Sequence, residues 1–353
     1  MSANAINNEQ VVGFFMETSF HYDVYRNIIL ELMHQKVPCE IIINNLIEDD
    51  FVNNMVSHLR TLNVPGLRFS LLSTVLQESK KYACLVSPYH LPYAVDVAKV
   101  HIRTVYGLAK NEWNHAEWNN KYHHILCYSH YTEKSLNLAD RTKVVGNPRF
   151  DDWHNNAYTL DCPDYLKLSS TKPTLLYAPT FGELSSIIHW AEKLSRLSNE
   201  FNVIAKLHHG TLYKKSERLA LKTAKRFLKK IVQPETSTFT LLKRADYVIS
   251  DNSGFIFDAI NADKNIILLD WDGRENLLKD NNSFSTHESP EQQVRKFLPV
   301  ARDMVDIRNY LSDDYPWSEQ AEMMQHIKTE YCDAFNDGNA GKRAAQVIID
   351  AIM

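Results

Sequence analysis

Long apolar runs are missing from this sequence. No stretch of about 18 or more apolar residues occurs, so no transmembrane helix is expected. The polar N-terminus has no charged start followed by an apolar core, which argues against a signal peptide. Internal repeats and low-complexity segments are also lacking. These absences together predict a cytoplasmic protein.

Cysteine and net charge are both low. The five cysteines are scattered, and no pair has metal-ligand or redox spacing. A reducing compartment is therefore expected, and a structural zinc site is not. A net charge of −4 gives no general argument for nucleic-acid binding. The length of 353 residues suits two domains of an ordinary soluble protein.

Short apolar runs alternate with helix-length amphipathic stretches along most of the chain. This alternation predicts parallel sheets covered by helices on both faces. The predicted strands are 11–15, 40–43, 69–72, 83–86, 124–128, 174–178, 201–207, 247–250 and 265–269. The predicted helices are 21–36, 51–62, 189–199, 214–231, 317–335 and 342–352.

The elements fall into two sets, which predicts an α/β fold of two doubly wound domains. The first domain is expected over 1–151 and the second over 174–325, with an aperiodic linker at 152–173 rich in Asn, Asp, Pro and Ser. The last segment, 326–353, is expected to form C-terminal helices that can pack back on the first domain. Two such domains predict a ligand cleft at the carboxyl ends of their strands.

Three polar loops directly follow predicted strands of the second domain. Because the carboxyl ends of parallel strands share one edge of a sheet, these loops should converge. Together they carry cationic and hydroxyl donors suited to a diphosphate, and the turn at 250–254 opens a helix whose N–H groups favour phosphate. Plain helix capping is the alternative for that turn. The candidate residues are Thr180, Lys206, His208, Ser250 and Ser253.

Several motifs of the sequence together resemble the motifs of a known family. They are Leu176–Phe181, Ile204–His208, Ala245–Asp258, Val144–Asp151 and Tyr122–Thr132. These motifs make the chain similar to the CDP-glycerol:poly(glycerophosphate) glycerophosphotransferases, which are the primases and polymerases of teichoic acids and related capsules. The similarity runs from roughly residue 100 to 270.

The resemblance implies a GT-B fold with an acceptor domain followed by a nucleotide-donor domain. It also implies a transfer without metal or other cofactor, in which an acceptor hydroxyl attacks the β-phosphorus of a CDP-alcohol and CMP leaves. The phosphate-handling histidine of the family falls on His208. Its serine-rich donor turn falls on Ser250, Asp251, Asn252, Ser253 and Gly254.

One position departs from the family pattern. The N-terminal histidine that the family is thought to use as general base falls on Tyr106, and an unperturbed tyrosine is a poor base at neutral pH. His21 and Glu17 follow the first predicted strand and are the replacement candidates, with His21 as the hypothesis. Arg103 and Lys110 flank Tyr106 and are candidates for the acceptor side.

The expected partners are CDP-glycerol or a related donor and a polysaccharide or lipid-linked acceptor, with no nucleic acid. The stretch 214–231 is basic and amphipathic, so it can lie on anionic lipid at the inner face of the cytoplasmic membrane, or simply cover a sheet. Two alternatives stay open for function. One is a GT-B glycosyltransferase that uses a nucleotide sugar, and the other is a catalytically silent protein that binds a nucleotide or glycan.

Overall fold

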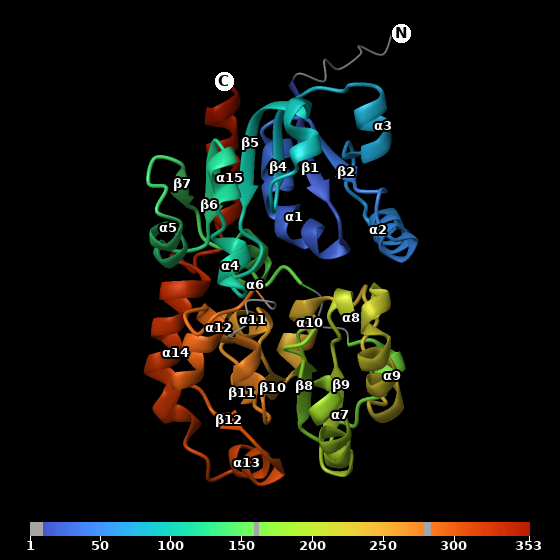
Figure 1. Ribbon diagram of the computed structural model, residues 1–353, viewed down its shortest axis with the longest axis vertical. Coiled ribbons are helices and arrows are strands. Elements are labelled where there is room, and N and C mark those ends of the chain that lie inside the picture. The colour runs from blue at the N-terminus through green and yellow to red at the C-terminus, as the bar shows by residue number, and fades with distance from the viewer. Residues whose placement is uncertain (1–9, 159–161, 279–283) are drawn as a thin grey trace. The chain divides into compact units, whose positions relative to one another are not determined.

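The computed structural model describes residues 10–158, 162–278 and 284–353 (Figure 1). The chain forms two compact units. Unit 1 comprises the chain up to Tyr106 together with His115–Ala157 and Asp333–Met353, and unit 2 comprises Gly107–Asn114 and Tyr158–Cys332.

The unit boundaries differ in detail from the predicted ones. One crossing falls after Ala157, inside the segment expected to be a linker, of which 159–161 lie outside the described residues. The last return to unit 1 begins at Asp333 rather than at residue 326. The short excursion Gly107–Asn114 into unit 2 was not predicted, because it carries no change of composition.

Unit 1 is built on a parallel sheet of seven strands in the order β3-β2-β1-β4-β5-β6-β7. The strands are β1 (Val12–Met16), β2 (Cys39–Ile43), β3 (Arg68–Leu71), β4 (Tyr82–Ser87), β5 (Ala98–Thr104), β6 (His124–Cys127) and β7 (Thr142–Val144). The helices are α1 (Ser19–His34), α2 (Asp49–Thr61), α3 (Leu72–Gln77), α5 (His130–Leu136), α6 (Asp151–His154) and α15 (Ala340–Ile352), with a 3₁₀ segment η2 (Pro92–Val97).

The sheet of unit 1 is covered on both faces at β1, an interior strand that is buried throughout. Val12 and Phe14 of β1 point into one hydrophobic core, whereas Val11 and Phe15 point into another on the opposite face. Strand β5 is not predicted from the sequence, because Lys99 and other polar residues interrupt its run of apolar residues.

Helix α15 packs against α1 although the two are far apart in sequence (Figure 1). Gly341 permits the approach, since a Cβ there would lie 2.9 Å from the backbone of Asn27. The Asp151 carboxylate accepts the N–H groups of Ala340 and Gly341 at 2.9 and 2.6 Å and so caps this helix. Asp151, part of the family-like motif, therefore holds the end of the chain in unit 1.

Unit 2 is built on a parallel sheet of five strands in the order β12-β11-β10-β8-β9. The strands are β8 (Thr174–Ala178), β9 (Asn202–Ala205), β10 (Tyr247–Ser250), β11 (Asn265–Leu269) and β12 (Val300–Ala301). The helices are α4 (Asn111–Asn114), α7 (Ile187–Ser195), α8 (His209–Tyr213), α9 (Arg218–Phe227), α10 (Thr238–Arg244), α11 (Phe255–Asn261), α12 (Pro290–Gln293), α13 (Met304–Tyr310) and α14 (Ala321–Ile327).

Two predicted helices of unit 2 are shorter than expected. The stretch 214–231 forms α9 over only Arg218–Phe227, because the chain turns extended at Leu228 and Ile231 pairs with Ala205 beside β9. The stretch 317–335 is divided into a 3₁₀ segment, α14 and a π-helical segment at Lys328–Cys332.

Candidate functional site

The polar loops of unit 2 meet at one edge of its sheet, as the sequence predicts. Thr180 follows β8, Lys206 follows β9 and Ser250 ends β10. These three strands are neighbours and parallel, so their carboxyl ends lie side by side. We call this the donor edge, defined by residues 179–186, 206–210 and 250–254.

A buried carboxylate organises the donor edge. Asp251, 0% exposed, accepts the backbone N–H of Thr180 and Ser186 at 2.8 Å each, and that of Asn252 at 2.6 Å. The Ser186 hydroxyl donates to the same carboxylate at 2.7 Å. Burial raises the pKa of Asp251, and these donors oppose the shift. Asp251 therefore fixes the loop after β8 against the loop after β10.

Other residues of the turn 250–254 also have internal roles. The Ser250 hydroxyl donates to the Ala178 carbonyl at 2.7 Å, and the Asn252 amide donates to the Leu184 carbonyl at 2.9 Å. The Ser253 hydroxyl accepts the N–H of Phe255 at 3.2 Å. The structure thus assigns Ser250 and Asn252, which the sequence suggested as phosphate ligands, to the scaffold. Gly254 is only half-buried.

His208 forms a helix cap rather than part of a strand. Strand β9 ends at Ala205, and the Nδ1 atom of His208 accepts the N–H of Gly210 at 2.9 Å. The neutral ring therefore carries its proton on Nε2. Phe181 stacks on the imidazole with ring centroids 4.4 Å apart. Gly210 makes room for this stack, because a Cβ there would lie 2.7 Å from the Phe181 ring.

Several cations surround this histidine. Desolvation, His209, and the charges of Lys110, Lys206 and Lys214 together hold the pKa of His208 well below its ordinary value. The ammonium groups of Lys110 and Lys214 lie 4.1 and 5.0 Å from the centroid of the Phe181 ring. His208 is therefore a neutral hydrogen-bond donor among positive charges, which is a suitable environment for a phosphate.

Lys110 belongs to unit 2 and not to the acceptor side, where the sequence suggested it. Its backbone N–H lies 3.4 Å from Oε1 of Glu291, a side chain that is 0% exposed and also accepts the Ser285 hydroxyl at 2.6 Å. Burial raises the pKa of Glu291 to about 7. No sequence signal distinguishes Glu291. Phe181 ends a family-like motif and Lys214 opens the basic stretch, but only the fold brings them to His208 and Lys110.

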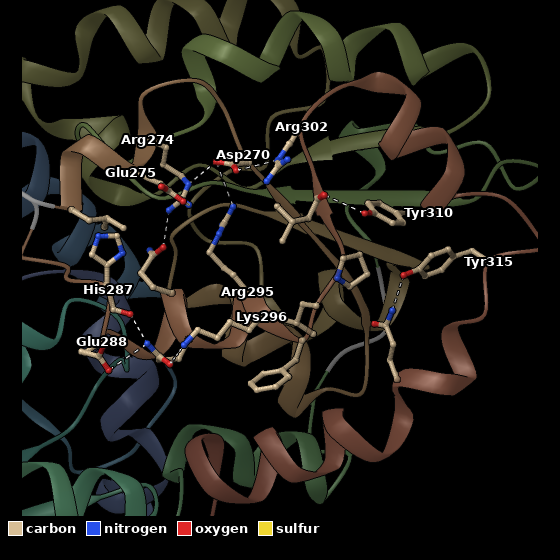
Figure 2. A pocket seen from close by; sticks show the side chains of 18 residues that line it. Asp270, Arg274, Glu275, His287, Glu288, Arg295, Lys296, Arg302, Tyr310 and Tyr315 are labelled. Carbon is tan, nitrogen blue, oxygen red and sulfur yellow. Dashed lines mark hydrogen bonds and ion pairs between the residues drawn. The ribbon is translucent and has the colours of Figure 1, made fainter.

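A cavity of about 660 Å³ adjoins this network in unit 2 (Figure 2). Gln292 lines it and donates to the Asn252 side-chain oxygen at 2.8 Å, while Arg274 donates to Gln292 at 2.7 Å. Asp270 in turn accepts from Arg274 at 2.7 Å, and Figure 2 shows Arg302 also directed toward it. The cavity wall thus braces the donor edge from the β11 side.

The remaining candidates lie in unit 1. His21 is 4% exposed, its Nδ1 accepts the backbone N–H of Glu17 at 3.1 Å, and burial lowers its pKa to about 3. Its neutral ring holds the proton on Nε2, so the geometry does not favour His21 as a base. Arg103 is 1% exposed and donates to the Pro88 carbonyl at 3.0 Å, which makes it a support for the loop after β4. Tyr106 is half-buried beside His21, with ring centroids 5.6 Å apart.

The described residues also bear on metal binding and on membrane insertion. No group of three or more His, Cys, Asp or Glu side chains among them is arranged to hold a metal ion. None of the described helices combines the length and the apolar character needed to cross a bilayer.

The chain matches the family model of CDP-Glycerol:Poly(glycerophosphate) glycerophosphotransferase over residues 94–350, well over half of its length. The chain therefore belongs to this family. It is an enzyme of the glycerophosphotransferase class, which confirms the predicted family and favours it over a nucleotide-sugar glycosyltransferase. No curated protein sequence matches the chain.

Solved structures with the same fold include relatives at low sequence identity. The wall teichoic acid polymerase TagF has a TM-score of 0.66 at 15% identity, covering 98% of this chain and 89% of its own. UDP-GlcNAc 2-epimerase from Neisseria meningitidis, bound to UDP-GlcNAc, has a TM-score of 0.61 at 13% identity over 96% and 99% of the two chains. A putative UDP-N-acetylglucosamine 2-epimerase from Listeria monocytogenes scores 0.62 at 11% identity over 97% of each chain. These matches confirm a GT-B-like α/β fold with parallel sheets.

Proposed function

We propose that the chain transfers glycerol phosphate, or a related polyol phosphate, from its CDP-alcohol to a hydroxyl group of a cell-surface polysaccharide or lipid-linked acceptor, releasing CMP. Family membership supports the glycerophosphotransferase reaction and CDP-glycerol as donor. The similar polymerase TagF has been solved after a soak with CDPG, which is consistent with this donor. Teichoic acid or a related capsule polymer is the proposed product class.

The environment of His208 carries this proposal. Its Nε2–H would donate to an oxygen of the donor diphosphate, while Lys110, Lys206 and Lys214 would balance the negative charge. As the bond to CMP breaks, charge accumulates on the leaving phosphate, and fixed donors in a desolvated site stabilise it most strongly. Ammonium groups can thus supply the positive charge without a metal ion or other cofactor.

Nucleotide release from a donor panel tests the proposal. CDP-glycerol, CDP-ribitol, UDP-sugars and CMP-sugars are incubated without added metal, with and without a cell-envelope polysaccharide extract. We expect CMP release from a CDP-alcohol only. The variant His208→Ala should lower turnover about 100-fold or more, as loss of a donor at a charge-developing oxygen does.

The variant His208→Asn separates catalysis from capping. An asparagine can still accept the Gly210 N–H and donate from its amide, so it should recover part of the lost turnover. His189→Ala serves as a matched control, because His189 lies on α7 and stacks on Trp271 at 5.1 Å. Nucleotide release from a sugar nucleotide alone, or an active His208→Ala, would contradict the proposal.

The proposal also predicts where in the cell the reaction takes place. A lipid-linked acceptor would place the reaction in the cytoplasm, at the inner face of the membrane. Helix α9 supports this, because its exposed side chains are mostly basic and Leu219 is 68% exposed. Attraction of such a helix to anionic lipid needs no transmembrane segment.

A further inference from the structure

The carboxyl edge of the unit 1 sheet gathers polar and aromatic side chains from four neighbouring strands. Glu17 follows β1, Asn44 follows β2, Tyr89 follows β4 and Tyr106 follows β5. These strands are adjacent and parallel in the order β2-β1-β4-β5, so the four residues share one edge. We call them the acceptor edge.

Glu17 is the carboxylate of this edge. Its Oε2 accepts the Asn44 amide at 3.0 Å, and the Tyr89 hydroxyl donates to the same carboxylate. Burial and the Glu17 charge raise the pKa of Tyr89, so the phenol keeps its proton and remains a donor. Glu17 itself is only half-buried, which leaves room for a further hydrogen-bond partner at the carboxylate.

His21 supports Glu17 instead of competing with it. The bond from the Glu17 N–H to Nδ1 of His21 fixes the backbone from which the carboxylate projects. The His21 ring also lies edge-on to Tyr89 and Tyr106, with centroids 6.2 and 5.6 Å away. A buried neutral imidazole held in this way orients its neighbours without taking up a proton.

Aromatic rings border the carboxylate. Tyr89 and Tyr106 lie 6.4 Å apart by their centroids, and Tyr93 of η2 is 51% exposed. The Glu17 charge contributes, after burial, to a raised pKa of Tyr93, so this ring lies near the carboxylate. A carboxylate beside one exposed and two half-buried aromatic rings suits a hydroxyl-bearing sugar or polyol, because the C–H faces pack on the rings while the hydroxyl donates to the carboxylate.

We propose that Glu17 is the general base of the transfer and that Tyr89 and Tyr93 bind the sugar or polyol that carries the attacking hydroxyl. This inference rests on the proposed function. In the reaction, the acceptor oxygen forms a bond to the β-phosphorus of the donor, and its proton passes to the Glu17 carboxylate. The bond from that phosphorus to the bridging oxygen breaks, and CMP leaves with the electron pair.

The base role explains the departure from the family at Tyr106. A base is required on the acceptor side, and at the acceptor edge Glu17 is the group that both reaches the surface and accepts a proton. Asn44 and Tyr89 position the carboxylate through hydrogen bonds, while Tyr106 supports His21.

Glu17→Gln is the first test, since it keeps the shape and one accepting oxygen but removes the base. Turnover with CDP-glycerol should fall about 100-fold or more, the contribution usual for a general base. KM for CDP-glycerol and Tm should stay unchanged. Two acceptors, a glycerol phosphate oligomer and a disaccharide-lipid analogue, distinguish a polyol from a sugar as the bound group.

Chemical rescue provides a readout that a purely structural role would not give. Added formate should restore part of the turnover of Glu17→Ala, and it should not affect the wild type. His21→Asn, whose oxygen can still accept the Glu17 N–H, should retain more turnover than His21→Ala, which loses that acceptor. Glu31→Gln is the matched control, because Glu31 lies in the same unit, on α1, and its carboxylate accepts from Gln35 at 2.8 Å.

The outcomes separate this inference from the proposed function. A wild-type chain that turns over CDP-glycerol together with an equally active Glu17→Gln would overturn the base assignment alone. So would a loss in Glu17→Ala that formate cannot restore. A wild-type chain that releases no CMP from any CDP-alcohol would overturn both.

Discussion

The two units each carry a carboxylate just after an interior strand of a parallel sheet, Glu17 after β1 and Asp251 after β10, but in different environments. Asp251 in unit 2 is 0% exposed and accepts four hydrogen bonds from surrounding loops. Glu17 in unit 1 is half-buried and accepts from the Asn44 amide and the Tyr89 phenol. The first is saturated by its own fold, whereas the second has accepting capacity left.

This difference separates a scaffold carboxylate from a reactive one. A carboxylate whose lone pairs are all used has no capacity for a substrate proton, and its removal leaves several donors unpaired. A partly exposed carboxylate can meet a substrate, and its removal affects chemistry more than folding. The two edges also differ in charge, because cations surround His208 in unit 2 and aromatic rings surround Glu17 in unit 1.

The largest stability effect is expected at Asp251. Asp251→Ala leaves the donors of Thr180, Ser186 and Asn252 without their acceptor, so the free energy of unfolding should fall by about 3–5 kcal/mol. Urea denaturation measures this loss, and the affinity for CDP should fall with it because the loops after β8 and β10 are no longer held together.

Two controls sharpen this comparison. Asp246→Asn, near the other end of β10, alters one bond to the Thr174 N–H and should cost only about 1 kcal/mol. Glu17→Gln should change the free energy of unfolding by less still. A Glu17 variant as unstable as Asp251→Ala would show that the two carboxylates stabilise the fold to the same extent.

A smaller change in the free energy of unfolding is expected from the ionisation of Glu291. Its pKa is raised from 4.5 to about 7, so the folded state binds the proton more tightly than the unfolded chain does. The resulting stabilisation is complete below pH 4.5 and is lost as pH rises through about 7, a change of about 3 kcal/mol. Glu291→Gln should remove this part of the pH dependence in urea denaturation between pH 4 and 8.

Unit 1 supplies the control for that slope. Asp151 has a pKa raised to about 6, mainly by burial, so it adds a slope of the same sign that ends at lower pH. Asp151→Asn should therefore leave the change between pH 6 and 7 intact. An unchanged slope in Glu291→Gln would mean that the buried Glu291 side chain is not the group that titrates.

The smallest effect per residue concerns the surface of unit 2. Changing Lys222, Lys225 and Lys229, all exposed near α9, to Gln should weaken binding to phosphatidylglycerol vesicles at low salt. The expected loss is about 1 kcal/mol per charge, without a change in turnover on a soluble acceptor. Changing Lys36, Lys99 and Lys143 of unit 1 to Gln is the matched control. Equal binding by both triple variants, or no binding by the wild type, would contradict the proposed contact with the membrane.

Much of the fold could be predicted because it depends on local patterns. The apolar runs of β1 and β10 identify central strands, since both faces of a parallel sheet are buried. Strand β5 could not be found in this way, because it alternates polar and apolar residues, and α9 was predicted too long, because amphipathic spacing continues past the point where Ile231 pairs with Ala205. Pattern alone does not report such tertiary pairing.

The sequence by itself determined the class of protein, most of its strands in chain order, and the positions of His208, Lys206 and Glu17 near strand ends, because these follow from hydrophobic periodicity and from motifs of contiguous residues. Only the tertiary structure decided what each side chain does. It turned Ser250 and Asp251 inward, set the His208 tautomer through the Gly210 N–H, and brought Lys110 to Glu291 across a separation of 181 residues. The physical reason is that protonation and hydrogen bonding depend on neighbours in space, and those neighbours come from distant parts of the chain.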